Sequence, residues 1–243
     1  MIKISILIPA YNEQATIIEI LEHVGRQKID GVDFEVIVID DCSIDRTVEL
    51  LESRPELYTR LVKQQQNGGK GAAVKAGLAE AVGDFILFQD ADLEYDPDDY
   101  EKLLAPVLQF DADVVMGSRM IASPITRVSY FWHKVGNRMI TLTFNILNNT
   151  TFTDVYSCYL LYRRSLVPHE SLTTLGWEQH AEILTHAVGA GKKYFEVPIS
   201  YYGRSYEEGK KIRAHHVIAV LWTMLIKRLG RTRSGEGLPA NGD

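Results

Sequence analysis

Two aspartates separated by one residue, Asp90 and Asp92, are the residues of this sequence best suited to bind a metal ion. They follow Phe85–Phe88, a short apolar run that we interpret as a buried strand. Carboxylates at positions i and i+2 point to the same side and repel each other when they are unpaired. A hard divalent cation, Mg²⁺ or Mn²⁺, removes that repulsion and also holds phosphates. Alternatively, the two residues form only a polar loop that caps a helix before Pro97.

The elements that must position these aspartates alternate between strands and helices. The predicted strands are Ile4–Ile8, Glu35–Ile39, Leu61–Val62, Phe85–Phe88 and Val114–Met116. The helical periods between them are Ile17–Val24, Val48–Leu51 and the Ala-rich segment Ala72–Val82. Continuous apolar strands that alternate with helices are typical of an α/β fold, in which helices cover both faces of a mostly parallel sheet.

Polar residues follow the strands at the point where each one ends. The four strand ends carry Pro9–Glu13, Asp40–Thr47, Asn67–Ala73 and Gln89–Glu94. They supply several acids, a tyrosine that is able to stack on a base, and Lys70 in a glycine-rich turn. Ligands of parallel sheets bind outside the carboxyl ends of the strands, so we expect the binding site at this edge.

The glycine-rich turn matches neither of two common nucleotide-binding motifs. A Walker loop would need glycine at position 64 and serine or threonine at position 71, where this chain has Gln64 and Gly71. A dinucleotide-binding loop read from Gly69 would need a third glycine where this chain has Val74. A flexible entry to the helix near Ala72 remains as the alternative.

Together these motifs resemble the donor half of the family 2 glycosyltransferases, which have the GT-A fold. The motifs that carry this resemblance are Pro9–Glu13, Asp40–Thr47, Asn67–Val74, Gln89–Pro97 and Gly117–Arg119. Within the family, the chain is most similar to dolichol- or polyprenol-phosphate hexosyltransferases. The motifs for this subgroup are Thr153-Asp154, Cys158-Tyr159, Tyr162–Arg164, Glu196–Ile199 and Gly203–Ile212. The resemblance covers about residues 3–212.

The resemblance implies a role for each matching residue. The nucleotide diphosphate sugar would be bound by Pro9, Tyr11, Glu13, Ile39, Asp41, Lys70, Asp90, Ala91, Arg204, Lys210 and Lys211. The Mg²⁺ or Mn²⁺ ion would be bound by Asp90, Asp92 and Glu94. Catalytic roles would fall to Asp92, Arg119, Asp154 and Glu182. Arg119 would face a phosphate, and the cationic segment 203–211 would close over the phosphates when the donor binds.

The acceptor is left open, because the chain departs from the subgroup at Trp177–Glu182 and at Arg213–His216. In an inverting transfer to a polyprenyl phosphate, the anionic phosphate oxygen attacks without a strong base. Transfer to a hydroxyl needs a base, for which Asp154, Glu178 and Glu182 are the candidates. A third hypothesis is a nucleotide-sugar-binding protein without catalysis, which the intact metal-binding and arginine motifs oppose.

Composition and charge limit the class of protein. With 46% apolar and 24% charged residues, the chain has the composition of an ordinary soluble protein. An apolar run of about 18 residues, a signal-peptide pattern and a cysteine framework are not recognised in this sequence, so we expect a cytoplasmic protein that acts in solution or at the cytoplasmic face of a membrane. The net charge is −6, yet eight Lys or Arg residues and only two acids lie in residues 204–233. This excess is either a solvated face or a surface for phosphate on a ligand or membrane. A nucleic-acid partner is disfavoured, since no basic and aromatic residues interleave.

The apolar decapeptide Val217–Ile226 is too short to span a bilayer. It is either a core helix that caps the domain or an interfacial helix with a basic end, which would place the enzyme beside a lipid-linked acceptor. We assign residues 1–230 to one domain, with a donor half (1–118), an acceptor half (119–212) and a C-terminal helix (213–230). Residues 231–243 are expected to be a disordered tail.

Overall fold

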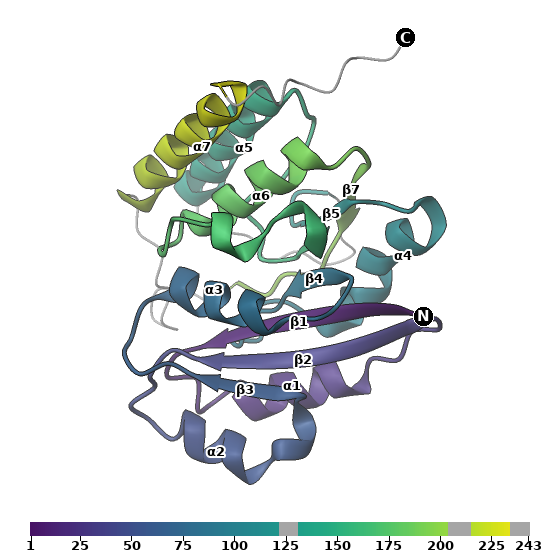
Figure 1. The fold of residues 1–243 in the computed structure, drawn as a ribbon, viewed down its shortest axis with the longest axis vertical. Coiled ribbons are helices and arrows are strands. Elements are labelled where there is room, and N and C mark those ends of the chain that lie inside the picture. Colours follow the sequence, from purple (N-terminus) through teal and green to yellow (C-terminus); the bar gives the residue numbers. More distant parts are fainter. Residues whose placement is uncertain (122–130, 204–214, 234–243) are drawn as a thin grey trace.

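The computed structural model describes residues 1–121, 131–203 and 215–233, and Figure 1 shows their arrangement. The predictions for Arg204, Lys210, Lys211 and the closing segment lie outside the described residues. Most of the predicted tail lies outside them as well.

The described residues form one seven-stranded sheet with the strand order β3-β2-β1-β4-β6-β5-β7. Its strands are β1 (Ile2–Ala10), β2 (Val32–Asp40), β3 (Arg60–Lys63), β4 (Phe85–Phe88), β5 (Val114–Ser118), β6 (Leu160–Arg163) and β7 (Tyr194–Pro198). Only β6 is antiparallel to its neighbours, β4 and β5. The predicted α/β class with a mostly parallel sheet is therefore confirmed.

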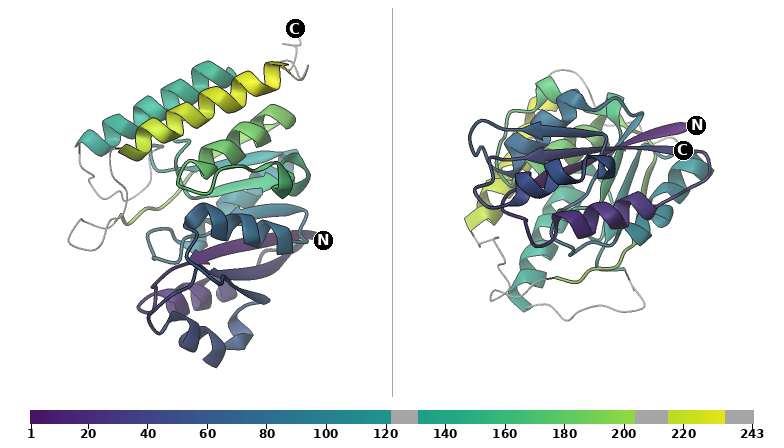
Figure 2. Two further views of the ribbon diagram at one scale, coloured as in Figure 1. Left: turned by 60° about the vertical axis from the view of Figure 1, so that its left-hand side comes forward. Right: turned by 90° about the horizontal axis from the view of Figure 1, so that it is seen from below.

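The helices form layers on the two faces of this sheet. They are α1 (Ile17–Arg26), α2 (Thr47–Ser53), α3 (Lys70–Glu80), α4 (Tyr100–Phe110), α5 (Phe131–Asn148), α6 (Gln179–Ala190) and α7 (His215–Arg233). Helices α3 and α6 cover one face, and α1 and α4 cover the other (Figures 1 and 2). Each packs by an apolar stripe, as α1 does with its buried Ile17, Ile20, Leu21 and Val24 at helical spacing.

Helices α5 and α7 lie side by side as an outer layer against α6 (Figure 2). Helix α7 continues through Arg233, three residues beyond the predicted end of the C-terminal helix. Its Val220 and Met224 are buried, whereas Trp222 and Ile226 are 63% and 47% exposed. The helix thus packs on the domain with one face and leaves an apolar face uncovered. No helix in the described part of the chain is long and apolar enough to cross a membrane.

The register of the parallel strands brings the predicted polar residues to one edge of the sheet. Ala10 at the end of β1 is paired with Asp40 at the end of β2, and Leu7 of β1 is paired with Phe88 at the end of β4. The loops that follow these three strands therefore start side by side, as the sequence predicts.

Candidate active site

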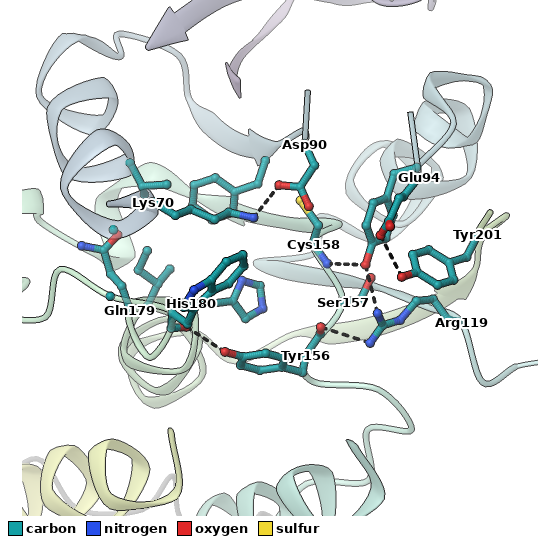
Figure 3. Close-up of a pocket in the computed structure, with 17 residues that line it drawn as sticks. Lys70, Asp90, Glu94, Arg119, Tyr156, Ser157, Cys158, Gln179, His180 and Tyr201 are labelled. Carbon is teal, nitrogen blue, oxygen red and sulfur yellow. Dashed lines mark hydrogen bonds and ion pairs between the residues drawn. The ribbon is translucent and has the colours of Figure 1, made fainter. Parts of the chain in front are cut away.

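Two adjoining hollows lie at the carboxyl ends of the central strands. The larger hollow, of about 340 Å³, is lined by Pro9, Ala10, Tyr11, Glu13, Asp41, Asn67, Gly69, Lys70, Ala73, Asp90, Ala91, Asp92, Glu94, Trp177 and Tyr201. The smaller hollow, of about 100 Å³, reaches inward to Arg119, Tyr156, Ser157, Cys158 and His180 (Figure 3). The residues that line both hollows are Lys70, Asp90, Glu94, Trp177 and Tyr201. The two hollows are therefore neighbouring parts of one site.

The larger hollow brings together the predicted donor-binding residues of the described chain, with one exception. Ile39 is fully buried in β2 and lines neither hollow. It packs so closely on α3 that a Cβ atom at Gly77 would lie 2.6 Å from its Cδ1 atom. The side chain of Ile39 is therefore part of the core, and a contact of this residue with the donor stays a prediction.

The glycine-rich turn is tied to Asp41, which follows the neighbouring strand β2. Each carboxylate oxygen of Asp41 accepts a backbone N–H of the turn, from Gly68 at 2.9 Å and from Gly69 at 2.8 Å. Gly69 has a φ of 83°, which favours glycine, and a Cβ atom at Gly71 would lie 2.4 Å from the Leu175 carbonyl carbon. The glycines thus permit a left-handed turn and a close approach of two backbones, rather than only a flexible entry to α3.

Asp90 forms an ion pair with Lys70, the first residue of α3. Burial alone would raise the pKa of Asp90, but the adjacent ammonium group lowers it below the usual value. Burial alone would lower the pKa of Lys70, but the Asp90 carboxylate raises it above its usual value. The charge of Asp90 is therefore compensated by a residue 20 positions away, a partner that the sequence did not indicate.

A buried glutamine, Gln89, holds the backbone of the loop that follows β4. This loop, residues 90–95, contains Asp90 and Asp92 and is called the aspartate loop below. Its side-chain amide donates to the carbonyl of Asp90 at 3.0 Å and to that of Tyr95 at 3.4 Å. Its carbonyl oxygen accepts the hydroxyls of Tyr100 and Tyr159, both at 2.8 Å. All the polar atoms of the Gln89 amide are thus engaged, so the loop is fixed by neutral hydrogen bonds below it.

The carboxylates of the aspartate loop are suitable ligands for a divalent cation, although the described residues do not supply a complete set of metal ligands. The described residues contain no group of three or more His, Cys, Asp or Glu placed to hold a metal ion. The carboxylate of Glu94 accepts the Tyr201 hydroxyl at 2.8 Å. Asp90 and Asp92 line the same hollow with carboxylate oxygens, and Mg²⁺ is often bound by one or two carboxylates together with the phosphates of a substrate.

Leu93 lies between the second aspartate and Glu94 in a left-handed conformation, with a φ of 60°. This conformation is strained for a bulky L-residue, and such strain is concentrated at functional sites. The turn is accompanied by a hydrogen bond from the Glu94 backbone N–H to Oδ1 of Asp92, at 3.2 Å. No feature of the sequence indicated this strained position.

Arg119 and Asp154 form a buried ion pair behind the smaller hollow. The Nε and Nη2 atoms of Arg119 donate to the two carboxylate oxygens of Asp154 at 2.7 and 2.9 Å. Arg119 also donates to the Tyr95 hydroxyl and to the Tyr156 carbonyl, so four of its five N–H groups are used by described residues. Burial alone would lower the pKa of Arg119, but Asp154 raises it. Arg119 reaches the wall of the hollow with little capacity left for a phosphate.

The backbone turn that carries Asp154 is held by Glu196 of β7. The Glu196 carboxylate accepts the backbone N–H groups of Thr153 at 2.9 Å and of Asp154 at 3.0 Å. The motif Glu196–Ile199 therefore positions the buried ion pair.

None of the three candidate bases lines either hollow. Asp154 is fully buried against Arg119, and Glu178 accepts the backbone N–H of Gly176 at 3.3 Å. Glu182 is fully buried, accepts hydrogen bonds from the threonines that precede α6, and is paired with Lys227 of α7. Burial would raise the pKa of Glu182, but its hydrogen bonds, first that from Lys227, lower it to about 2. The geometry therefore opposes Glu182 as a base and gives it a role in fixing α7.

Sequence reasoning assigned no role to two aromatic residues that line both hollows, Trp177 and Tyr201. The Lys70 ammonium lies 5.5 Å from the centre of the Trp177 ring, and the Arg119 guanidinium lies 5.0 Å from the centre of the Tyr201 ring. In the sequence, Trp177 directly precedes Glu178, and Tyr201 lies two residues before the motif that begins at Gly203. This proximity to the motifs was the signal that could have indicated a role in the site. Their aromatic faces form part of the wall that the two hollows share.

A mostly parallel sheet with an aspartate loop at its carboxyl edge defines the GT-A class of fold, and solved structures agree. The glucosyl-3-phosphoglycerate synthase of Mycobacterium tuberculosis, solved with Mn²⁺, UDP and its product, aligns at a TM-score of 0.63 and 21% identity, over 99% of this chain and 82% of that one. The TarS protein of Staphylococcus aureus aligns at a TM-score of 0.59 and 20% identity, over 96% and 73% of the two chains.

The sequence comparison gives the family. The family model described as Glycosyl transferase family 2 matches residues 5–169, and the chain belongs to this family. It is 28% identical over 211 residues to a dolichol-phosphate mannosyltransferase of Pyrococcus furiosus, which covers 86% of this chain and 59% of the relative. It is 30% identical over 212 residues to an undecaprenyl-phosphate 4-deoxy-4-formamido-L-arabinose transferase of Pseudomonas aeruginosa, covering 85% and 60%. The chain thus spans about three fifths of the length of these relatives.

Proposed function

We propose that this protein transfers a hexose from a nucleotide diphosphate sugar to a polyprenyl phosphate, with inversion at the anomeric carbon. The observation that carries the proposal is the larger hollow, which joins Tyr11 and Asp41 at the ends of β1 and β2 to Asp90 and Asp92 after β4. The first pair suits a nucleoside base, and the second pair suits a metal-bound diphosphate. The names of the two curated relatives, both transferases for a polyprenyl-type phosphate, support the acceptor.

The site residues would have different roles in the reaction. Asp90 and Asp92 would hold Mg²⁺ or Mn²⁺, which supplies a Lewis acid for the charge that develops on the leaving diphosphate. Lys70 adds a positive charge to the same wall of the hollow. The aspartate loop is fixed by Gln89 before any ligand arrives, so the carboxylates keep their places as the diphosphate binds.

The placement of the candidate bases favours a phosphate acceptor over a hydroxyl acceptor. Asp154, Glu178 and Glu182 are engaged with other groups and line neither hollow. A phosphate monoester, with a second pKa of about 6, is already anionic at neutral pH and needs no base to attack. Product formation on polyprenyl phosphates but not on free sugars is the expected result, and GDP-mannose and UDP-glucose are the donors to compare.

The base-binding end of the hollow is tested by the substitution Asp41→Ala. We expect the affinity for the nucleoside diphosphate to fall roughly 10- to 100-fold, since a hydrogen bond to a charged group contributes about 1.5–3 kcal/mol. Turnover at saturating donor should change much less, because Asp41 follows β2 and is not part of the loop that carries Asp90 and Asp92. Isothermal titration with GDP and UDP measures the affinity, and Asp33→Ala, at an exposed acid of β2, is the control. An unchanged affinity in Asp41→Ala would argue against this placement of the nucleoside.

We further propose that helices α5 and α7 bring the enzyme to the membrane that holds its acceptor. The exposed apolar residues of α5 recur on one face, at Trp132, Met139, Leu142 and Ile146. Those of α7 do the same, at Trp222, Leu225 and Ile226. Exposed Lys134 and Arg138 lie on α5 as well. Tryptophans and cations around an apolar face are typical of helices that lie in the interface of an anionic membrane.

Co-sedimentation with liposomes that contain anionic lipid tests this surface. The double substitution Trp132→Ser and Trp222→Ser should weaken binding at least tenfold, because burial of each large side chain contributes about 1.5–3 kcal/mol. Raising the salt concentration should weaken binding of the unaltered protein, since part of the attraction is electrostatic. Val82→Ser, at a 57% exposed residue after α3, is the control. Equal binding by the double variant and the control would exclude the two helices as the contact.

A further inference from the structure

Three residues that line the smaller hollow each carry a buried polar atom that has no hydrogen-bond partner among the described residues. The atoms are Oγ of Ser157, Oε1 of Gln179 and Nε2 of His180. Ser157 is fully buried and Gln179 is 2% exposed, so surface water does not satisfy them. A polar group that is buried without a partner costs stability, and several such groups around one hollow indicate a ligand that supplies the missing partners.

His180 presents a hydrogen-bond acceptor to this hollow. Burial, followed by the nearby charge of Lys70, lowers its pKa to about 4, so the imidazole is neutral at neutral pH. Its other ring nitrogen is hydrogen-bonded to the backbone of Val155. In a neutral imidazole one nitrogen carries the proton and the other accepts, so the bond to the Val155 carbonyl leaves Nε2 with a lone pair.

The smaller hollow adjoins the place that we propose for the donor diphosphate. It shares Lys70 and Asp90 with the larger hollow, so a group attached to a diphosphate at Asp90 and Asp92 could extend into it. Trp177 and Tyr201 line this passage with aromatic rings, against which the apolar face of a sugar ring can pack. Figure 3 shows His180 between the Lys70–Asp90 pair and Tyr156.

The unpaired atoms select hydroxyl groups over an anion. Nε2 of His180 and Oε1 of Gln179 are acceptors, and an ionised phosphate has no hydrogen to donate to them. The hydroxyls of a hexose do donate, and the hydroxyl of Ser157 can both donate and accept.

We propose that the smaller hollow binds the hexose of the donor and that His180 determines its specificity, by accepting a hydrogen bond at Nε2 from one hexose hydroxyl. This inference rests on the proposed function, since it takes the donor to be a nucleotide diphosphate sugar. His180 belongs to the segment in which the chain departs from its subgroup, which fits a residue that reads the particular sugar.

The test is calorimetric titration of the full chain with Mg²⁺ present, in which each nucleoside diphosphate is compared with its sugar conjugate. The probes are UDP, UDP-glucose, GDP and GDP-mannose. In His180→Leu, the affinity for the preferred nucleotide sugar should fall roughly tenfold, while that for the free nucleoside diphosphate stays unchanged. His180→Gln, which retains an acceptor, should recover part of the loss. Ser157→Ala should weaken the same conjugate without affecting the nucleoside diphosphate.

Donors that lack one hydroxyl, such as deoxyfluoro analogues of the preferred nucleotide sugar, identify the contact. One analogue should bind the unaltered protein roughly tenfold more weakly than the parent does, yet bind His180→Leu as well as the parent does. A loss of affinity in His180→Leu that is equal for nucleoside diphosphate and conjugate would show a merely structural role and overturn the proposal. Unchanged affinity for all four ligands would overturn it as well.

These outcomes are separate from those of the proposed function. If the unaltered protein binds the nucleotide sugars but forms no product on polyprenyl phosphate, the acceptor is wrong and the role of His180 stands. If it binds neither nucleotides nor their conjugates, both proposals fail.

Discussion

Asp92→Asn is expected to lower turnover at saturating donor and metal by roughly 10²- to 10³-fold, since a metal that neutralises the leaving diphosphate contributes several kcal/mol to the barrier. Asp92 lines the larger hollow beside Asp90, and Asn removes its charge with little change of shape. The chain should remain folded, because Gln89 holds the backbone of the loop and the side-chain oxygen of Asn can still accept the Glu94 N–H. The activity of the unaltered enzyme should likewise depend on added Mg²⁺ or Mn²⁺.

The measurement is initial-rate kinetics over a metal titration, beside a thermal unfolding curve for each variant. Asp33→Asn, at an exposed acid on β2, is the matched control and should keep full activity. Full activity of the unaltered enzyme in excess chelator, or turnover of Asp92→Asn equal to that of the control, would contradict the role of the aspartate loop.

The largest expected effect on stability comes from Asp154→Ala, which should lower the free energy of unfolding by about 3–5 kcal/mol. Asp154 is fully buried, and its two carboxylate oxygens accept hydrogen bonds from the guanidinium of Arg119 at 2.7 and 2.9 Å. Removing the carboxylate leaves a buried, uncompensated positive charge. Asp154→Asn should lose less, because the amide oxygen still accepts one of the two bonds.

Urea unfolding followed by circular dichroism checks this prediction. Glu49→Ala is the control, since Glu49 of α2 pairs with Arg46 at the surface and should contribute far less. A combined Arg119→Met and Asp154→Leu variant should regain part of the lost stability, because it removes both buried charges. Equal losses in Asp154→Ala and Glu49→Ala would show that burial of the pair has no energetic consequence.

The strands that carry the site were predictable because their signals are local. β1, β2 and β4 are continuous apolar runs followed by polar loops, and parallel pairing brings the ends of such strands to one edge. β6 was not predicted, because the four residues Leu160–Arg163 pair in the antiparallel sense with strands that are distant in sequence. No local sequence pattern indicates that this strand lies between β4 and β5 in the sheet.

The partners of the candidate bases could not be predicted from the sequence, because an ion pair between distant residues leaves no local signal. Asp154 was chosen for its charge and motif, but its partner Arg119 lies 35 residues earlier. Glu182 is neutralised by Lys227 from another helix. The smaller hollow was missed for the same reason, since it combines Lys70 and Asp90 of the predicted donor half with His180 and Tyr201 of the predicted acceptor half.

Hexose transfer to a lipid phosphate is tested most directly by incubating the protein with a labelled nucleotide sugar, Mg²⁺ and polyprenyl phosphate in liposomes. GDP-mannose and UDP-glucose are supplied in separate reactions, and the lipid and water-soluble products are separated by extraction. We predict labelled polyprenyl phosphate hexose from one of the two donors, no such product in excess chelator, and little product with Asp92→Asn. Labelling of a soluble sugar hydroxyl, with none of the polyprenyl phosphate from either donor, would contradict the proposed function.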